Sequence, residues 1–191
     1  FPYTTLFRSP AAHRLVSGRR RMSTPTTQPR TSAGTRHAGH VEVECAPVVS
    51  DARLADHFRI RHEVFVEEQH LFQGSDRDVH DTDAGVVHVL AAIGSVPVGT
   101  VRLFPLDVTG ELWQGDRLAV LPAHRVHGAG APLVRFAVAC ARAQGGRRMV
   151  AHIQLPNVLF FHRLGWSLSG PVETYLGAEH QPMHIDLAGD G

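Results

Sequence analysis

The sequence predicts an α/β (α+β) fold in one domain, with a mixed sheet of six to seven strands and helices on both faces. Two observations lead to this fold class. First, 43% of the residues are hydrophobic, and about 150 residues follow a polar N-terminal stretch, which suits a single domain with one core. Second, strand-like and helix-like patterns follow in the order strand, helix, three strands, helix, strand, helix, two strands. This order is typical of a mixed sheet covered by helices.

The first elements are a strand and a helix. Residues 41–49 begin with alternating Val and Glu and are rich in β-branched Val, which predicts a strand. Ser50 is a typical N-cap residue, and Leu54, Phe58 and Phe65 after it recur at helical spacing. A helix therefore follows the strand.

The middle of the chain predicts a loop and three strands. Residues 70–84 are polar and contain glycine, which indicates a loop. Residues 86–93 and 96–103 are largely apolar and flank a Gly94-Ser95 turn, as expected for a hairpin. Residues 112–121 give the next strand.

Two helices and three strands complete the prediction. The first helix follows Gly128 and Gly130 and ends at Gly145-Gly146, since glycine suits a helix C-terminus. The remaining elements are a strand at 148–154, a short helix at 156–164 and strands at 166–169 and 183–187.

The N-terminal residues differ in composition from the rest. The string FPYTTLFRS at residues 1–9 matches the translation of a common sequencing-library adapter, so we expect residues 1–21 to be a non-native leader. The alternative is a basic transit peptide. A secretory signal peptide is not expected, because the stretch lacks the apolar core of such a signal. Residues 22–40 have almost nothing to bury, which predicts a disordered tail. The folded domain is then expected over residues 41–188.

The charge balance depends on where the protein starts. Five of the 19 arginines precede Met22, which leaves 14 arginines against 18 acidic residues, a net charge of −4. A mildly acidic domain gives no support to a nucleic-acid or membrane partner, since these need a basic patch.

Other features point to a cytoplasmic protein. No apolar run approaches the ~20 residues that a membrane span needs. Cys45 and Cys140 are far apart and have no metal-binding spacing, so we interpret them as thiols in a reducing compartment.

The stretch HRVHGAGAPL from residue 124 places two glycines before a helix. The start of a helix carries unpaired backbone N–H groups and about half a positive charge, and glycines allow a phosphate to approach the backbone closely. The stretch therefore predicts a phosphate site. The alternative is that Gly128 and Gly130 only let the helix pack close to a strand.

Several segments resemble the GNAT family of N-acetyltransferases. Arg125-x-x-Gly128-x-Gly130 is similar to the family's Q/R-x-x-G-x-G/A signature, residues 117–122 resemble its central strand, and residues 157–166 resemble its N-x-x-x-x-Y-x-x-x-G-F segment.

Further matches resemble one subgroup of that family. Residues 61–69, RHEVFVEEQ, are similar to its R-x-x-V-F-x-x-E-Q opening. His152 with Gln154, and His180 with Met183, match its H-x-Q and H-x-x-M motifs. The similarity is closest to the nitrogen-starvation N-acetyltransferases. The name of this subfamily implies a role in bacterial nitrogen metabolism but identifies no substrate.

The resemblance implies a site for acetyl-CoA as co-substrate. In the family two parallel central strands splay apart, and the pantetheine arm of the cofactor lies in the gap. Here the backbone around Leu118 to Val120 would pair with that arm, and the N–H of Val120 would polarise the thioester carbonyl, a contribution of about 3 kcal/mol. The residues expected at the cofactor are Leu118, Ala119, Val120, Arg125, Val126, His127, Gly128, Ala129, Gly130, Ala131, Asn157 and Phe161.

Two positions depart from the family pattern. Val126 stands where glycine usually follows the signature arginine, so the backbone must avoid positive φ there. Phe161 stands where a tyrosine often protonates the departing thiolate, and phenylalanine has no proton to give.

The expected general base is His152 or Glu68. An imidazole titrates near neutral pH and can take a proton from an ammonium group, and Glu68 matches the glutamate of the subgroup motif. Each could instead be structural: a histidine in the core, or a carboxylate in solvent. Gln154, His88 and His180 are the expected substrate-binding residues.

We expect no metal site, because the acidic run at residues 76–83 lacks the glycine and terminal glutamate of a calcium loop. That run is interpreted as a solvated loop that attracts a cationic amine.

The function implied is an acetyl-CoA-dependent N-acetyltransferase in which a primary amine of a small metabolite attacks the thioester directly. One alternative is a catalytically weak or inactive acetyl-CoA-binding sensor, and another is use of a longer acyl donor. The family is often dimeric, so a homodimer stays open.

Overall fold

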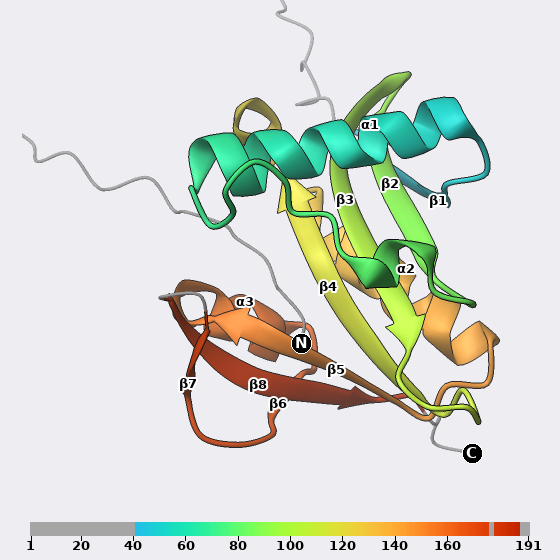
Figure 1. Ribbon diagram of the computed structural model, residues 1–191, viewed down its shortest axis with the longest axis vertical. Helices are drawn as coiled ribbons and strands as arrows, with labels where there is room; N and C mark the ends of the chain where they lie inside the picture. Colours follow the sequence, from blue (N-terminus) through green and yellow to red (C-terminus); the bar gives the residue numbers. More distant parts are fainter. Residues whose placement is uncertain (1–40, 176–177, 188–191) are drawn as a thin grey trace, which may run out of the picture.

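The computed structural model describes residues 41–175 and 178–187. The predicted leader and tail, residues 1–40, lie outside them. The chain forms one eight-stranded sheet in the order β1-β2-β3-β4-β5-β8-β6, with β7 paired to β8 (Figure 1). The strands are β1 Glu44–Pro47, β2 Val87–Ile93, β3 Val96–Pro105, β4 Leu112–Val120, β5 Arg148–Gln154, β6 Ser167–Leu168, β7 Glu173–Tyr175 and β8 Ala178–Asp186.

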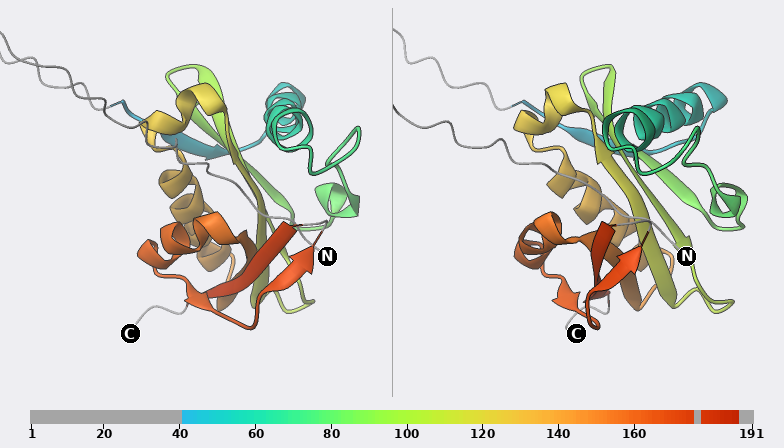
Figure 2. Two further views of the ribbon diagram at one scale, coloured as in Figure 1. Left: turned by 90° about the vertical axis from the view of Figure 1, so that its left-hand side faces the viewer. Right: turned by 60° about the vertical axis from the view of Figure 1, so that its left-hand side comes forward.

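Helices cover both faces of this sheet, which confirms the predicted fold class. Figure 2 shows α1 and α2 on opposite sides of the central strands. The helices are α1 Asp51–Arg61, continued by the π-helical turn η1 His62–Glu68, then α2 Gly130–Ala143 and α3 Val158–Arg163. Short 3₁₀ turns are η2 Val79–Thr82, η3 Pro122–His127 and η4 Leu155–Asn157.

Each helix is held by a small set of apolar contacts. Ser50 caps α1, its hydroxyl accepting from the N–H of Arg53 at 3.4 Å. Ile60 and Phe65 bury the inner side of α1 and η1 against the sheet, whereas Leu133 and Ala137 do the same for α2 on the opposite face. At roughly 25 cal/mol per Å² of buried apolar surface, these contacts supply the main driving force for helix docking.

The strand count exceeds the prediction because of the C-terminal region. Residues 173–175 form a strand that was not predicted, and β8 begins at Ala178 rather than at 183. Residues 173–175 and 178–182 are mostly polar, so they lack the apolar alternation that marks a half-buried strand.

The parallel strands β4 and β5 separate partway along their length. They pair only at Leu112 with Arg148, Trp113 with Met149 and Gln114 with Val150. Beyond Gln114 the two strands diverge (Figure 1), as predicted for a splayed central pair.

A bulge lies on the separated part of β4. The register with β3 shifts between Thr100 and Arg102, and Arg117 opposite has φ 50°. A left-handed conformation costs a non-glycine residue about 1–3 kcal/mol. The Thr100 hydroxyl donates to the Arg117 carbonyl at 2.9 Å, which helps to fix the bulge.

A buried network of charges lies on the α1 face of β3 and β4. Arg102 is fully buried, and its guanidinium donates to both oxygens of Asp116 at 2.8 and 2.6 Å and to Asp78 at 2.6 and 3.0 Å. Burial alone would lower the pKa of Arg102, but Asp116 and Asp78 outweigh it and raise that pKa. The other members of the network are Arg61, Arg117, Asp76 and Asp81.

This network corrects the expectation of a solvated acidic loop. Asp76 is only 2% exposed, and Asp81 is paired with Arg61 at 2.5 Å. Asp76, Asp78 and Asp81 therefore neutralise buried arginines and are not free to attract a distant amine. Asp83, the remaining carboxylate of the run, is paired with His80. Within residues 41–175 and 178–187, no group of three His, Cys, Asp or Glu side chains is arranged to hold a metal ion.

His57 and His88 make stability depend on pH. His57 is fully buried, and burial, together with the charge of Arg61 and the neighbouring His88, holds its pKa well below the ordinary value. The carbonyl of Val101 and the charge of Asp81 oppose this shift. The pKa of His88 is also lowered, first by burial.

Acidification is therefore expected to destabilise the fold. Below the unfolded pKa of about 6.5 the unfolded chain binds protons that the folded chain excludes, so each such histidine costs about 1.4 kcal/mol per pH unit. When the melting temperature is measured from pH 7.5 to 5, it should decrease once the pH drops under about 6.5. The decrease should be less steep in His57→Leu than in the wild type. The same change at the exposed His162 should leave the slope as it is. A pH-independent melting temperature would contradict this account.

No helix in the described part of the chain is long and apolar enough to cross a membrane.

Candidate active site

The predicted phosphate loop joins β4 to α2. Gly128 ends η3 with φ 72°, and a Cβ there would meet no atom within 4 Å. The first turn of α2 has no acidic side chain, and its N-cap residue, Ala129, makes no side-chain hydrogen bond. The helix start thus offers backbone N–H groups to an anion without competition from a protein carboxylate.

Arg125 of this loop is turned away from solvent and toward η1. Its Nε donates to the carbonyl of Val120 at 3.1 Å, and its two terminal nitrogens donate to Glu68 at 2.7 and 2.5 Å. This bidentate pair ties the end of η1 to the loop that follows β4. Because both oxygens of Glu68 accept from a guanidinium, the carboxylate is poorly placed to take a proton from a substrate.

His152 lies on the separated part of β5, and the structure gives it a carboxylate partner. Its Nε2 is 2.9 Å from Oε1 of Glu173 on β7. When Nε2–H donates to this carboxylate, the lone pair resides on Nδ1, which is buried and has no hydrogen-bond partner among the described residues. Such an orientation is the one that a general base needs.

The surroundings keep His152 neutral near pH 7. Burial, which is the largest influence, lowers the pKa of His152, and the nearby His180 acts in the same direction. The charge of Glu173 raises that pKa but does not cancel the effect of burial. A neutral imidazole is the form that accepts a proton.

The sheet register gathers three of the predicted residues on one face. In the strand register, His180 of β8 lies opposite Gln154 of β5 on one side and opposite Glu173 of β7 on the other. His152 lies two residues before Gln154 along β5. Side chains of such positions share a face. The structure does not bring His88 to this group, because it lies on β2, with its ring 4.8 Å from that of His57 and its Nε2–H donating to the Asp81 carbonyl.

Phe161 of α3 lies near the gap on the α2 side, where it lines a small cavity together with Val134 and Ala137 of α2, and Asn157 lies in η4, directly after β5. Asn157 is 1% exposed, and Phe161 is 3% exposed and packs edge-on against Trp166 with ring centroids 5.3 Å apart. Sequence reasoning missed Glu173 and Trp166. A signal for Trp166 was its place at the end of the N-x-x-x-x-Y-x-x-x-G-F segment, whereas Glu173 sits on a strand too short to predict.

Neither cysteine is suited to attack a thioester. Burial raises the pKa of Cys45 to about 11 and also raises that of Cys140. Since the thiolate is the reactive form, these thiols are inert near neutral pH.

Comparisons with known proteins agree with this arrangement. The sequence profile of the acetyltransferase (GNAT) family matches residues 51–166. An acetyltransferase of Bacillus subtilis is 33% identical over 120 residues, which are 62% of this chain and 80% of the relative.

Solved structures show the same fold. An N-acetyltransferase from Lactobacillus plantarum superposes with a TM-score of 0.68 at 25% identity, over 76% of this chain and 99% of that one. Escherichia coli ElaA gives a TM-score of 0.67 at 22% identity, over 75% and 99% of the two chains. The chain therefore belongs to the acetyltransferase (GNAT) family, and it is an acyltransferase that uses acetyl-CoA as its co-substrate.

Proposed function

We propose that the protein transfers the acetyl group of acetyl-CoA to a primary amine of a small metabolite. The observation that carries this proposal is the His152–Glu173 pair on the separated part of β5. It supplies an oriented, neutral base beside the gap in which the thioester of the donor would lie.

The reaction would proceed by direct attack. Nδ1 of His152 takes a proton from the ammonium group, and the neutral nitrogen attacks the thioester carbonyl carbon. A C–N bond forms, the C–S bond breaks, and CoA leaves as a thiolate. The Val120 N–H would stabilise the oxyanion. As the amide forms, its nitrogen loses a second proton to water, and the thiolate takes a proton from water, because Phe161 has none to give.

The cofactor would be held by the backbone at the gap and by the phosphate loop. The separated edge of β4, around Leu118 to Val120, would pair with the pantetheine arm. The loop at Gly128 and Gly130 would bind the pyrophosphate through N–H groups at the start of α2. The absence of an acidic side chain in the first turn of α2 supports this assignment.

Glu68 is proposed to position Arg125, and thereby the phosphate loop, rather than to act as the base. Glu68→Gln should raise KM for acetyl-CoA about two- to fivefold, as expected for a partly exposed ion pair, with little change in kcat. Steady-state kinetics with varied acetyl-CoA would check this. A loss of kcat of about 10²-fold or more would instead identify Glu68 as the base.

The alternative is a sensor that binds acetyl-CoA without turning it over. Phe161 favours this alternative, because it replaces the tyrosine that often protonates the thiolate. Calorimetric titration with acetyl-CoA should show binding, and the same sample should then release thiol in the presence of a mixed library of primary amines. Binding without thiol release, with every amine offered, would support the sensor. No binding of acetyl-CoA or CoA would mean that Gly128 and Gly130 only pack a helix.

We also propose, on the motif matches quoted above, that the protein is a nitrogen-starvation N-acetyltransferase. This assignment concerns physiology and leaves the acceptor to be found by the amine screen.

A further inference from the structure

Gln114 of β4 lies where β4 and β5 separate, and its side chain projects to the α1 face of the sheet. The residues before and after it occupy the other face: Trp113 belongs to the core under α2, and a Cβ on Gly115 would lie 2.7 Å from Cε of Met149. Because side chains alternate along a strand, Gln114 projects the opposite way. It is the last residue of β4 that pairs with β5, where Val150 lies opposite.

The side-chain nitrogen of Gln114 is buried and has no hydrogen-bond partner among the described residues. The residue is only 2% exposed. Phe104 on β3 and Val150 on β5 lie on either side of it and offer no side-chain acceptor, and both oxygens of Asp116 accept from Arg102. A buried N–H without a partner destabilises a fold, so its presence here indicates a role in binding.

The same face of the sheet carries the proposed base. His152 lies two residues beyond Val150 along β5 and therefore projects to the same side. Its Nδ1, like the nitrogen of Gln114, has no partner among the described residues. Two positions along a strand are about 7 Å apart. A hydrogen-bond donor and a base thus lie across the gap from each other at the spacing of one small molecule.

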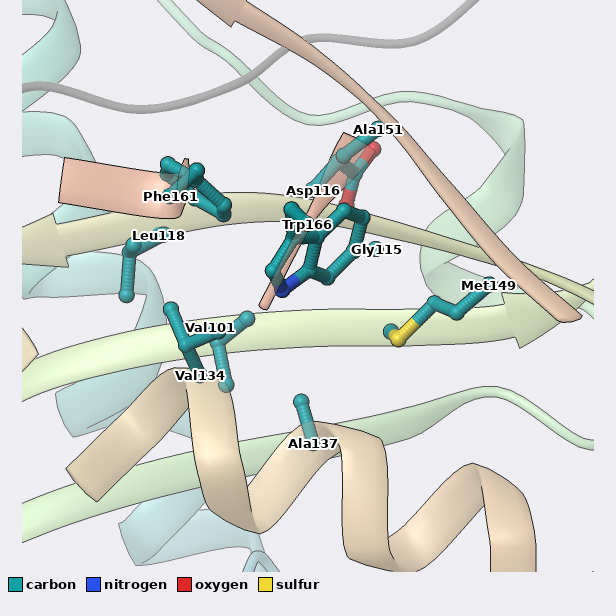
Figure 3. A pocket seen from close by; sticks show the side chains of 10 residues that line it. All are labelled: Val101, Gly115, Asp116, Leu118, Val134, Ala137, Met149, Ala151, Phe161 and Trp166. Atoms are coloured by element: carbon teal, nitrogen blue, oxygen red, sulfur yellow. The ribbon is translucent and has the colours of Figure 1, made fainter. Parts of the chain in front are cut away.

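The α2 face of the gap has little room for an acceptor. Apolar side chains, among them Val134, Ala137, Phe161 and Trp166, line a cavity there of about 20 Å³ (Figure 3). A space of this size holds about one water molecule. An acceptor therefore approaches the thioester from the α1 face.

We propose that Gln114 binds an oxygen atom of the acceptor amine, an inference that rests on the proposed function. The Nε2–H of Gln114 donates to this oxygen while the ammonium group of the same molecule lies on Nδ1 of His152. The offset between the two residues fits a spacer of about two to three carbons between nitrogen and oxygen.

The charges on this face indicate that the oxygen is neutral. The buried network holds three guanidinium groups and four carboxylates, a net charge of −1, from Arg61, Arg102, Arg117, Asp76, Asp78, Asp81 and Asp116. Glu173 adds a negative charge beside His152. These charges repel a carboxylate but not a hydroxyl, ether or amide oxygen. The acceptor class is therefore an amino alcohol, an amino ether or an amino-acid amide.

Two amines of nearly the same shape test the role of Gln114. 2-Methoxyethylamine has an ether oxygen where butylamine has a methylene group. The ratio of their kcat/KM values, measured by thiol release from acetyl-CoA, should fall about five- to tenfold in Gln114→Met. Because the same two amines are compared in both enzymes, their different basicities cancel. An unchanged ratio would overturn the proposal while leaving acetyl transfer intact, whereas no thiol release from wild type with any amine would overturn the proposed function.

Two further variants make this test specific. Gln114→Glu keeps an oxygen but loses the N–H, so it should lower the ratio as Gln114→Met does. A ratio kept in folded Gln114→Glu would overturn donation by the N–H, and if this variant does not fold, Gln114→Met still decides. Gln144→Met, the same change at an exposed position after α2, is the matched control and should keep the wild-type ratio.

Thermal unfolding separates binding from a structural role. Methionine fills a similar space and leaves no N–H unpaired, so Gln114→Met should melt at or above the wild-type temperature. A lower melting temperature together with an unchanged ratio would show that Gln114 only supports the fold.

Calorimetry of the CoA-bound enzyme tests the neutral oxygen. β-Alaninamide and β-alanine both carry an ammonium group at pH 7 and differ in the charge at the other end. The amide should bind about fivefold more tightly or better. Tighter binding of β-alanine would overturn the assignment of a neutral oxygen.

Discussion

Replacing His152 by glutamine is expected to lower kcat for amine acetylation by a factor of about 10²–10⁴, the range that a general base contributes. Glutamine keeps a polar side chain of similar length but cannot accept the proton of an ammonium group near neutral pH. The KM for acetyl-CoA should stay close to wild type, because His152 lies on β5 rather than in the phosphate loop. Steady-state kinetics with the best amine of the screen would measure both.

The partner of His152 should be visible in the pH profile. Since the charge of Glu173 raises the pKa of His152 against the effect of burial, Glu173→Gln should move the acid limb of kcat to lower pH and reduce its plateau. A carboxylate with only a structural role would leave the position of that limb unchanged.

His184→Gln is the matched control for these variants. His184 lies on the neighbouring strand β8, is half-buried, and shares a hydrogen bond of 2.8 Å with Ser169. Its replacement should leave kcat and the pH profile unchanged. A His152→Gln enzyme with kcat within twofold of wild type would contradict the assignment of His152.

The second large effect concerns stability. Arg102→Met should destabilise the fold by about 3–5 kcal/mol, because the buried Asp116 would lose the guanidinium that donates to both of its oxygens and keep only Arg117 at 3.6 Å. Asp78 keeps its pair with Arg117 at 2.7 Å. For a domain of this size the melting temperature should fall by about 6–20 °C. Thermal unfolding at pH 7 would measure the change.

Two further variants make this test specific. Arg148 and Asp186 form an ion pair of similar length, 2.7 Å, but their side chains are 52% and 60% exposed. Arg148→Met should therefore leave the melting temperature nearly unchanged. The double variant Arg102→Met with Asp116→Leu should be more stable than Arg102→Met alone, since no buried charge is left unpaired. A single variant as stable as wild type would show that the network does not support the fold.

Much of the fold could be predicted because local patterns mark it. The cap at Ser50, the helical spacing after it and the Gly94-Ser95 turn each predict structure over a few residues, and the structure has α1 and the β2–β3 hairpin there. The separation of β4 from β5 has no local pattern. It came from the resemblance and is now shown by the register.

The polar parts of the site were harder to predict because their partners are distant in sequence. Arg117 and Asp76 are 41 residues apart, so nothing in the acidic run itself shows that it folds over buried arginines. Glu173 reaches His152 only because β7 pairs with β8, and a three-residue strand gives no periodicity to detect. No motif spacing linked His88 to the other predicted substrate-binding residues, and the structure places it beside His57.

The most direct test of the account follows a labelled acetyl group from acetyl-CoA in the presence of the preferred amine. We predict that the label leaves the thioester and is recovered on the nitrogen of the amine. One CoA should be released for each product, and no label should remain on the protein. Label recovered only as acetate, or covalently on the chain, would contradict direct transfer at the gap between β4 and β5.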